Sequence, residues 1–125
     1  MTINIAILDD SPMMEAFYKR QLGKEHELNI FTQPHQVLRK LIQNKPDLIL
    51  LDWGFSTDKI SLLKAIKRRR ELNDIPLIVL TGNPSQHFRR EGLKLGITDF
   101  LLKPFQPNEL QYLIKDQLGV KMYSQ

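Results

Sequence analysis

Short, almost wholly apolar runs alternate along the chain with longer segments whose apolar residues recur at helical spacing. Branched aliphatic residues dominate the short runs. We interpret these runs as buried strands, because they lack the apolar–polar alternation of a half-exposed strand. The predicted strands are 3–8, 28–31, 48–51, 77–80 and 100–102.

Helical stripes follow each of these runs and predict five helices. The weakest stripe belongs to the fourth helix, at about 85–95. The residues that mark the predicted inward faces are Met13, Phe17 and Arg20-Gln21; Val37, Leu38, Leu41 and Ile42; Ile60, Leu63 and Ile66; Phe88 and Leu95; and Leu110, Leu113, Ile114, Gln117 and Leu118.

Capping and breaking residues agree with these elements. Ser11 is placed to cap the first helix, with Pro12 at its first position. Residues that end or begin helices stand at the other predicted boundaries. They predict helix ends at Gly23, Lys45-Pro46, Ile75-Pro76 and Gly96, and a helix start at Pro107.

Five successive β–α units favour one α/β domain. Strands this apolar need both faces covered, so we expect a doubly wound parallel sheet with helices on both sides. In such sheets, ligands bind beyond the carboxyl ends of the strands, at the point where the strand order reverses. The functional residues should therefore lie at those ends.

Composition narrows the classes of protein and site. With 125 residues, the chain has the length of one domain. It has no cysteine, which excludes a disulfide framework, a thiolate metal site and a cysteine nucleophile. No run of 18 apolar residues and no secretory signal pattern is present, so we expect a cytoplasmic protein that does not span a membrane.

The positive charge is local. The net charge of +4 includes five basic residues between 64 and 70, and without them it would be −1. The simplest interpretation is a solvated helix end favoured by the helix dipole. A docking patch for an acidic partner is the alternative. No recognition helix or interleaved aromatic residues accompany the patch, which argues against direct nucleic-acid binding.

Charged and hydroxyl side chains follow four of the predicted strands. Asp9-Asp10 follows the first strand, Asp52 the third, Thr81 the fourth and Lys103 the fifth. Taken singly, each of Asp9 and Thr81 is more simply explained as a cap or turn residue, and Lys103 as a surface charge. All of them at the same edge of one sheet indicate a site.

Three crowded carboxylates repel each other unless a cation lies among them. Oxygen ligands without histidine or cysteine favour a hard ion such as Mg²⁺. Together with Thr81 and Lys103, such a site provides a carboxylate nucleophile, a metal, a hydroxyl and an ammonium. That set is what phosphoryl transfer to an aspartate requires.

With these residues in place, the chain resembles the receiver domain of bacterial two-component response regulators (CheY-like) over residues 3 to about 118. Four motifs carry the resemblance: Ile-Leu-Asp-Asp-Ser-Pro (7–12), Pro-Asp-Leu-Ile-Leu-Leu-Asp-Trp (46–53), Ile-Pro-Leu-Ile-Val-Leu-Thr-Gly (75–82) and Gly-Ile-Thr-Asp-Phe-Leu-Leu-Lys-Pro-Phe (96–105). The resemblance implies a flavodoxin-like sheet with strand order 2-1-3-4-5.

The resemblance also implies roles for single residues. Asp52 would be the phosphoacceptor, and Lys103, after which a cis peptide is expected, would pair with the phosphoryl group. Thr81 would bind a phosphoryl oxygen, and Phe100 would rotate inward as the switch. The implied Mg²⁺ ligands are Asp10, Asp52, the Gly54 carbonyl and, through water, Asp9.

Two features depart from the family pattern. The segment 55–60 after Asp52 is one residue short and lacks the usual proline and glycine, so we expect a reshaped loop beside the acceptor. Gly54 and Asn83 occupy the positions that modulate attack of water on the acyl phosphate. A bare glycine at 54 should hinder water little.

The implied function is a phosphorylation-dependent signalling switch that catalyses only its own phosphorylation and dephosphorylation. A non-phosphorylated protein-binding module is the alternative, supported by the altered loop alone. An aspartyl-phosphatase of the haloacid dehalogenase type is rejected. That chemistry requires two aspartates separated by one residue after the first strand, whereas Asp9 and Asp10 are adjacent. The pair Asp9-Asp10 argues against a flavin site, because it would repel phosphate.

The expected partners follow from the resemblance. A sensor histidine kinase or phosphotransfer protein would supply the phosphoryl group. The surface of the fourth helix, fifth strand and last helix would control a downstream protein or a removed output domain, and that surface leaves homodimerisation open. We expect residues 1–120 to form the receiver domain and 121–125 a short tail, with no output domain in this chain.

Overall fold

The computed structural model describes residues 2–55, 59–82 and 85–123, in which strands and helices alternate. The strands are β1 (Asn4–Leu8), β2 (Glu27–Phe31), β3 (Leu48–Asp52), β4 (Leu77–Thr81) and β5 (Asp99–Leu102). The helices are α1 (Pro12–Leu22), α2 (Val37–Gln43), α3 (Lys59–Arg68), α4 (Gln86–Lys94) and α5 (Pro107–Tyr123).

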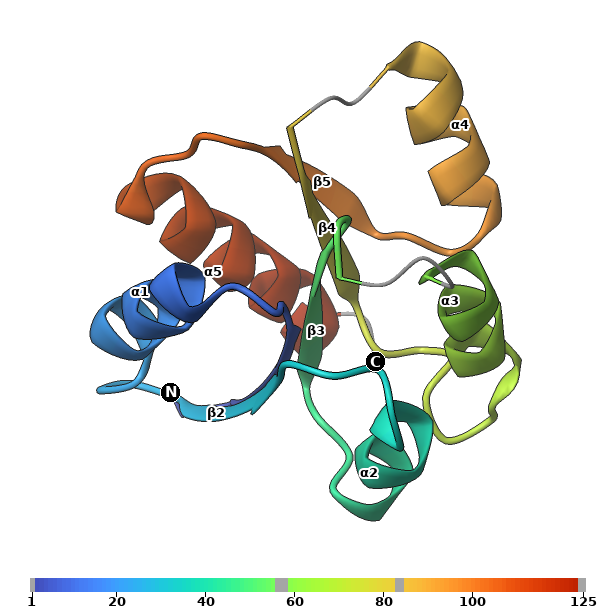
Figure 1. Ribbon diagram of the computed structural model, residues 1–125, viewed down its shortest axis with the longest axis horizontal. Helices are drawn as coiled ribbons and strands as arrows, with labels where there is room; N and C mark the ends of the chain where they lie inside the picture. The colour runs from blue at the N-terminus through green and yellow to red at the C-terminus, as the bar shows by residue number, and fades with distance from the viewer. Residues whose placement is uncertain (1, 56–58, 83–84, 124–125) are drawn as a thin grey trace.

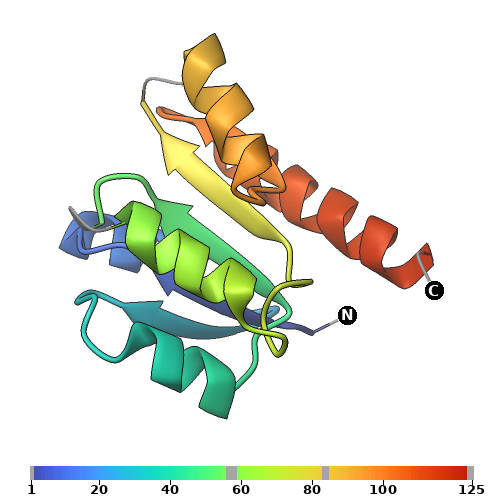
Figure 2. The same ribbon diagram turned by 90° about the vertical axis from the view of Figure 1, so that its right-hand side faces the viewer.

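The five strands form one parallel sheet in the order β2-β1-β3-β4-β5. Helices α1 and α5 lie on one side of the sheet, and α2 and α3 on the other (Figure 1). The view turned by 90° shows α2 and α3 in front of the strands (Figure 2). The predicted doubly wound architecture and its strand order are confirmed.

The apolar runs are continuous because both faces of the sheet are covered. Along β1, Ile5 and Ile7 belong to the core that includes residues of α1 and α5, whereas Ala6 and Leu8 belong to the core that includes residues of α2 and α3. All four are at most 1% exposed. At such buried positions, a change of leucine or isoleucine to alanine typically lowers the free energy of unfolding by about 2–5 kcal/mol.

Most predicted helix boundaries are confirmed, but the third helix ends at Arg68 and not at Ile75-Pro76. Ser11 Oγ accepts the Met14 N–H at 3.3 Å and caps α1, which begins at Pro12. Helix α4 ends in a left-handed turn at Gly96, with a φ of 91°, and the Ile97 N–H returns to the Gly92 carbonyl at 2.9 Å. Helix α5 begins at Pro107 and continues to Tyr123, into the predicted tail.

Three predicted inward residues are wrong, because Met13, Arg20 and Ile60 are exposed. Met13 is 81% exposed, because the row of α1 that faces the core is Met14, Tyr18 and Leu22. Ile60 is 37% exposed, since it lies in the first turn of α3, one turn before the buried Leu63. The side chain of Phe88, another predicted inward residue, lies outside the described part of the chain.

Among the described residues, no helix combines the length and the apolar character needed to cross a bilayer.

Candidate functional site

Three carboxylates meet at the carboxyl ends of two neighbouring strands. Asp9 and Asp10 follow β1, and Asp52 is the last residue of β3. The three side chains each offer an oxygen, and these oxygens lie within 4.8 Å of one another. Because β1 and β3 pair in parallel, their ends coincide, so the topology itself brings these acidic groups together.

Asp9 is the buried member of this group, only 1% exposed. Its Oδ1 accepts the Ser11 N–H at 3.0 Å, and its Oδ2 accepts the Tyr18 hydroxyl at 2.8 Å. Burial raises the pKa of Asp9, and the negative charge of Asp52 raises it further, whereas the two hydrogen bonds lower it. The site therefore holds a carboxylate at a position where burial disfavours its charge.

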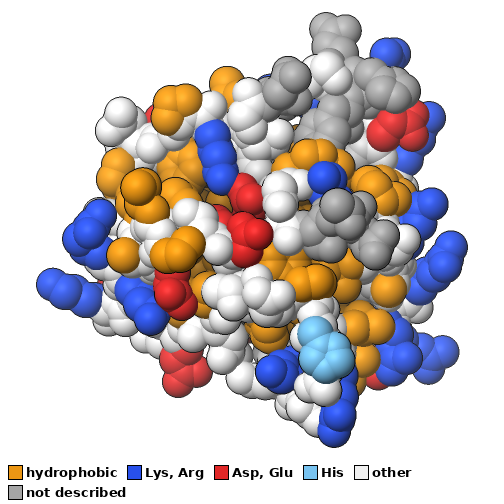
Figure 3. All heavy atoms as spheres, viewed as in Figure 1, with side chains coloured by type: hydrophobic (Ala, Val, Ile, Leu, Met, Phe, Trp, Pro, Cys, Tyr) orange, Lys and Arg blue, Asp and Glu red, His pale blue; other side chains and the backbone are white. Residues whose placement is uncertain are grey.

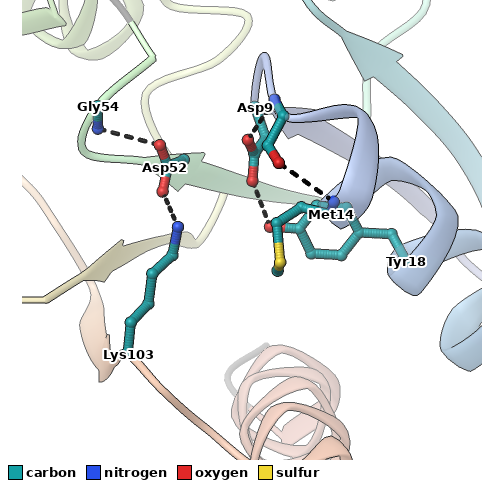
Figure 4. Close-up of polar contacts among 7 residues, drawn as sticks. Asp9, Met14, Tyr18, Asp52, Gly54 and Lys103 are labelled. Carbon is teal, nitrogen blue, oxygen red and sulfur yellow. Dashed lines mark hydrogen bonds and ion pairs between the residues drawn. The ribbon is translucent and has the colours of Figure 1, made fainter.

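Asp52 has a donor at each carboxylate oxygen. The Gly54 N–H donates to Oδ2 at 3.1 Å, and the Lys103 ammonium pairs with Oδ1 (Figure 4). Gly54 thus lies beside the acceptor through its N–H, while its carbonyl as a metal ligand stays a prediction. A Cβ at position 54 would stand 3.2 Å from Oδ2, so the glycine lets the backbone approach closely.

Lys103 reaches Asp52 from the loop that follows β5. The Lys103 N–H donates to the Thr81 carbonyl at 2.7 Å, and the following peptide bond, Lys103-Pro104, is cis as predicted. Thr81 ends β4 and is 6% exposed. The predicted residues Asp52, Thr81 and Lys103 therefore lie together.

A hollow of about 440 Å³ opens over this site. Its lining residues are Asp52, Trp53, Gly54, Lys59, Leu80, Thr81, Gly82 and Lys103. In the space-filling view, acidic side chains gather near the centre of one face with basic side chains beside them (Figure 3). The hollow is open enough for an anionic group to reach the Asp52 carboxylate.

A second cation faces this hollow. The Lys59 ammonium lies 5.0 Å from the centroid of the Trp53 ring, within cation–π range. Lys59 was not among the predicted site residues, because its partner Trp53 stands six residues earlier and on no shared helix. Residues 56–58 of the predicted reshaped loop lie outside the described residues, and so does Asn83.

Phe100, the predicted switch residue, lies on β5, which β4 separates from the acceptor strand β3. It is half-buried in β5, and its ring lies against Gly92 of α4. A Cβ at position 92 would stand 2.6 Å from Phe100 Cζ. The ring therefore occupies the space that the missing side chain of Gly92 leaves.

The residues at this site fit a divalent cation. The three clustered ligands are all carboxylates, which suits a hard ion. With the Lys103 charge included, the group carries a net charge of about −2, which a divalent ion would neutralise. Tyr18, like Lys59, was not among the predicted site residues; its signal in the sequence is a hydroxyl at helical spacing between Met14 and Leu22.

The family of response regulator receiver domains matches residues 5–115. The phosphate regulon transcriptional regulatory protein PhoB of Rhizobium meliloti is 28% identical over 120 residues, 94% of this chain and 53% of that protein. PhoB of Pseudomonas aeruginosa is 40% identical over 84 residues, 66% of this chain and 35% of that protein. The chain thus spans between about a third and a half of these relatives.

Solved structures agree in fold. The receiver domain of a sensor histidine kinase from Pseudomonas aeruginosa, with a magnesium ion coordinated in its active site cleft, has a TM-score of 0.83 and 26% identity, covering 95% of this chain and 99% of that one. The chemotaxis protein CheY4 of Vibrio cholerae has a TM-score of 0.85 at 22% identity, covering 93% and 98%, and shows the same fold.

The acidic cluster, the lysine after β5 and the strand order are thus found together in a chain that the family matches over most of its length. This chain belongs to the response regulator receiver domains of two-component signalling systems.

Proposed function

We propose that this receiver domain is a phosphorylation-dependent switch that accepts a phosphoryl group on Asp52. The observation that carries the proposal is the cluster of three carboxylate oxygens within 4.8 Å of one another, with the Lys103 ammonium on Asp52 at the mouth of the hollow. Asp52 is the reachable nucleophile of the cluster, because it lines the hollow, whereas Asp9 is buried and bonded to Tyr18.

Asp10 and Asp52 would hold Mg²⁺, with Asp9 acting through water and the Gly54 carbonyl as a further ligand. When bound, the ion would neutralise charge on the phosphoryl oxygens. The magnesium in the related receiver domain of the sensor kinase supports this assignment. Asp10 is exposed, whereas Asp9 is buried, so Asp10 is better placed to bind the ion directly.

In the transfer step, an Asp52 carboxylate oxygen attacks phosphorus, and the bond between phosphorus and the donor's leaving atom breaks. The donor keeps that bonding pair, and Asp52 becomes an acyl phosphate. The Lys103 ammonium leaves the Asp52 oxygen and pairs with the incoming phosphoryl oxygens. The Thr81 hydroxyl donates a hydrogen bond to one of these oxygens.

The switch would follow from these contacts. Thr81 moves toward the phosphoryl group, and Phe100 on the neighbouring strand rotates into the vacated space. The surface formed by α4, β5 and α5 then changes between two states. Phe100 is suited to this role because its ring packs against α4 at Gly92.

A sensor histidine kinase or a phosphotransfer protein would be the donor. An apolar hollow of about 420 Å³ lies next to Lys103, lined by Met14, Phe17, Pro104 and Phe105, and offers such a partner a contact beside the acceptor. The controlled protein or output domain would bind the α4–β5–α5 surface.

The test is incubation with acetyl phosphate and Mg²⁺, followed by intact mass measurement. We expect one phosphoryl adduct on the wild type, none on Asp52→Asn, and none after removal of Mg²⁺ with a chelator. The absence of an adduct on the wild type, or an unchanged adduct on Asp52→Asn, contradicts the proposal. A wild type that binds no Mg²⁺ would favour the non-phosphorylated binding module instead; Asp10→Ala should lose that binding.

A further inference from the structure

The buried Tyr18 side chain contacts the acidic cluster through Asp9. It is 0% exposed, among the largest fully buried side chains, and stands on α1 between Met14 and Leu22 in the core. Its ring makes an edge contact with Phe17 at 5.9 Å between centroids. Its hydroxyl donates to Asp9 Oδ2 at 2.8 Å (Figure 4).

The geometry fixes the Asp9 carboxylate at both oxygens. The Ser11 N–H holds Oδ1, and the Tyr18 hydroxyl holds Oδ2. A carboxylate oxygen has lone pairs for two partners, so each oxygen can still face a cation or its water. With both donors in place, the carboxylate group cannot rotate without breaking one hydrogen bond.

A buried hydroxyl needs a hydrogen-bond acceptor, and a backbone carbonyl would be sufficient for that purpose. Tyr18 instead donates to the least exposed carboxylate of the cluster, 1% exposed, where the charged form is costly without donors. The bond therefore favours a fixed, ionised Asp9 beside Asp10 and Asp52. Hydrogen-bond partners that orient metal ligands have a known influence on metal affinity, often 10–100-fold.

We propose that Tyr18 is a positioning residue of the cation site, which holds the Asp9 carboxylate in the orientation that a divalent ion requires. The inference rests on the proposed function, since it concerns the same site. It adds a residue of the α1 core to the machinery and ties the packing of α1 to ion affinity.

The first test is Mg²⁺ titration of the wild type and Tyr18→Phe, by calorimetry and by the fluorescence of Trp53, the single tryptophan. We expect about tenfold weaker binding in Tyr18→Phe. The ring is retained, so the packing should survive; urea unfolding without Mg²⁺ verifies the fold. Tyr112→Phe is the matched control, because Tyr112 on α5 is 71% exposed, and its affinity should be unchanged.

The second test separates positioning from a general effect on packing. If Tyr18 acts through Asp9, then Tyr18→Phe should weaken Mg²⁺ binding in the wild type but not in an Asp9→Asn background. Incorporation of 4-aminophenylalanine at position 18, which restores an N–H donor, should recover part of the affinity.

Equal affinities of the wild type and Tyr18→Phe overturn this inference and leave the proposed function standing. An equal loss of affinity in both backgrounds also overturns it, since the effect would then bypass Asp9. A wild type that binds no Mg²⁺ removes the proposed function and this inference together.

Discussion

The Lys103 ammonium pairs with the Asp52 carboxylate, bridging the carboxyl ends of β5 and β3 across the intervening β4. The positive charge of Lys103 thus partly neutralises the negative charge of Asp52, the proposed acceptor. Lys103 and a divalent cation would share Asp52, since both are attracted to the same carboxylate. The ammonium therefore opposes cation binding and assists the anionic phosphoryl group.

Lys103→Met should separate these two effects. Loss of one positive charge a few ångströms away should tighten Mg²⁺ binding about fivefold, the equivalent of about 1 kcal/mol at water-like screening. Phosphorylation by acetyl phosphate should slow about tenfold or more, because a cation on the transferring group is lost. Calorimetry and intact mass measure the two quantities.

The control for Lys103→Met is Lys115→Met, which removes the same charge from an exposed position on α5. It should leave both quantities unchanged. Weaker Mg²⁺ binding in Lys103→Met would contradict the competition between the two cations.

Asp9→Asn should stabilise the cation-free protein. Burial raises the pKa of Asp9, so the folded state binds this proton more tightly than the unfolded state, and the ionised group costs stability at neutral pH. The cost is absent below the ordinary pKa of an aspartate and develops as pH rises through the raised, folded-state pKa. Without Mg²⁺ at pH 7 we expect a gain of about 1 kcal/mol in the free energy of unfolding.

Urea unfolding of both proteins between pH 4 and 8 checks this prediction, and the advantage of Asp9→Asn should shrink toward acid pH. Added Mg²⁺ should reverse the order, because it stabilises the wild type more than Asp9→Asn. A variant less stable than the wild type without Mg²⁺ at pH 7 would show that the charge of Asp9 is well solvated.

Gly92→Ala should disturb the Phe100 ring. The added Cβ would lie 2.6 Å from Phe100 Cζ and 2.9 Å from Ile97 Cδ1, so the ring must shift. Overpacking of this kind costs about 1–3 kcal/mol, which exceeds the gain of up to about 1 kcal/mol in helix propensity. Thermal unfolding should show a lower midpoint, and the loss should shrink in a Phe100→Leu background.

Gly119→Ala is the control for Gly92→Ala, since an added Cβ there on α5 would meet nothing within 4 Å. It should be neutral or stabilising. If the two alanine variants behaved alike, the contact between Gly92 and Phe100 would carry no energetic weight.

Lys59→Gln should weaken the use of small anionic donors. The Lys59 ammonium lines the hollow over Asp52 and is held near the Trp53 ring, where it attracts an incoming phosphate. We expect a two- to fivefold higher acetyl phosphate concentration for half-maximal phosphorylation, from the loss of about 1 kcal/mol or less. Mg²⁺ binding should change little, and Lys64→Gln, exposed on the same helix, is the control.

Much of the fold follows from local patterns. The apolar runs predicted the strands because each run is buried on both faces of the sheet, and the first helix starts where Ser11 and Pro12 indicated. Asp9, Asp10 and Asp52 could be grouped from the sequence, because parallel strands bring their carboxyl ends to one edge.

Met13 and Tyr18 show where local patterns were insufficient. Both stand on α1, and apolar spacing favoured Met13 as the inward residue, but the face of α1 that packs on the core contains Tyr18 and leaves Met13 exposed. Which face packs inward depends on side chains of α5 and the strands, which no window of α1 contains.

The sequence by itself determined the order of elements and the identity of the clustered carboxylates, since period and strand ends are local properties. The tertiary structure alone decided that Tyr18 holds Asp9, that Lys103 pairs with Asp52 and that Lys59 lies over Trp53. Such contacts depend on how helices and loops pack against the sheet, and that packing is set by the whole core at once.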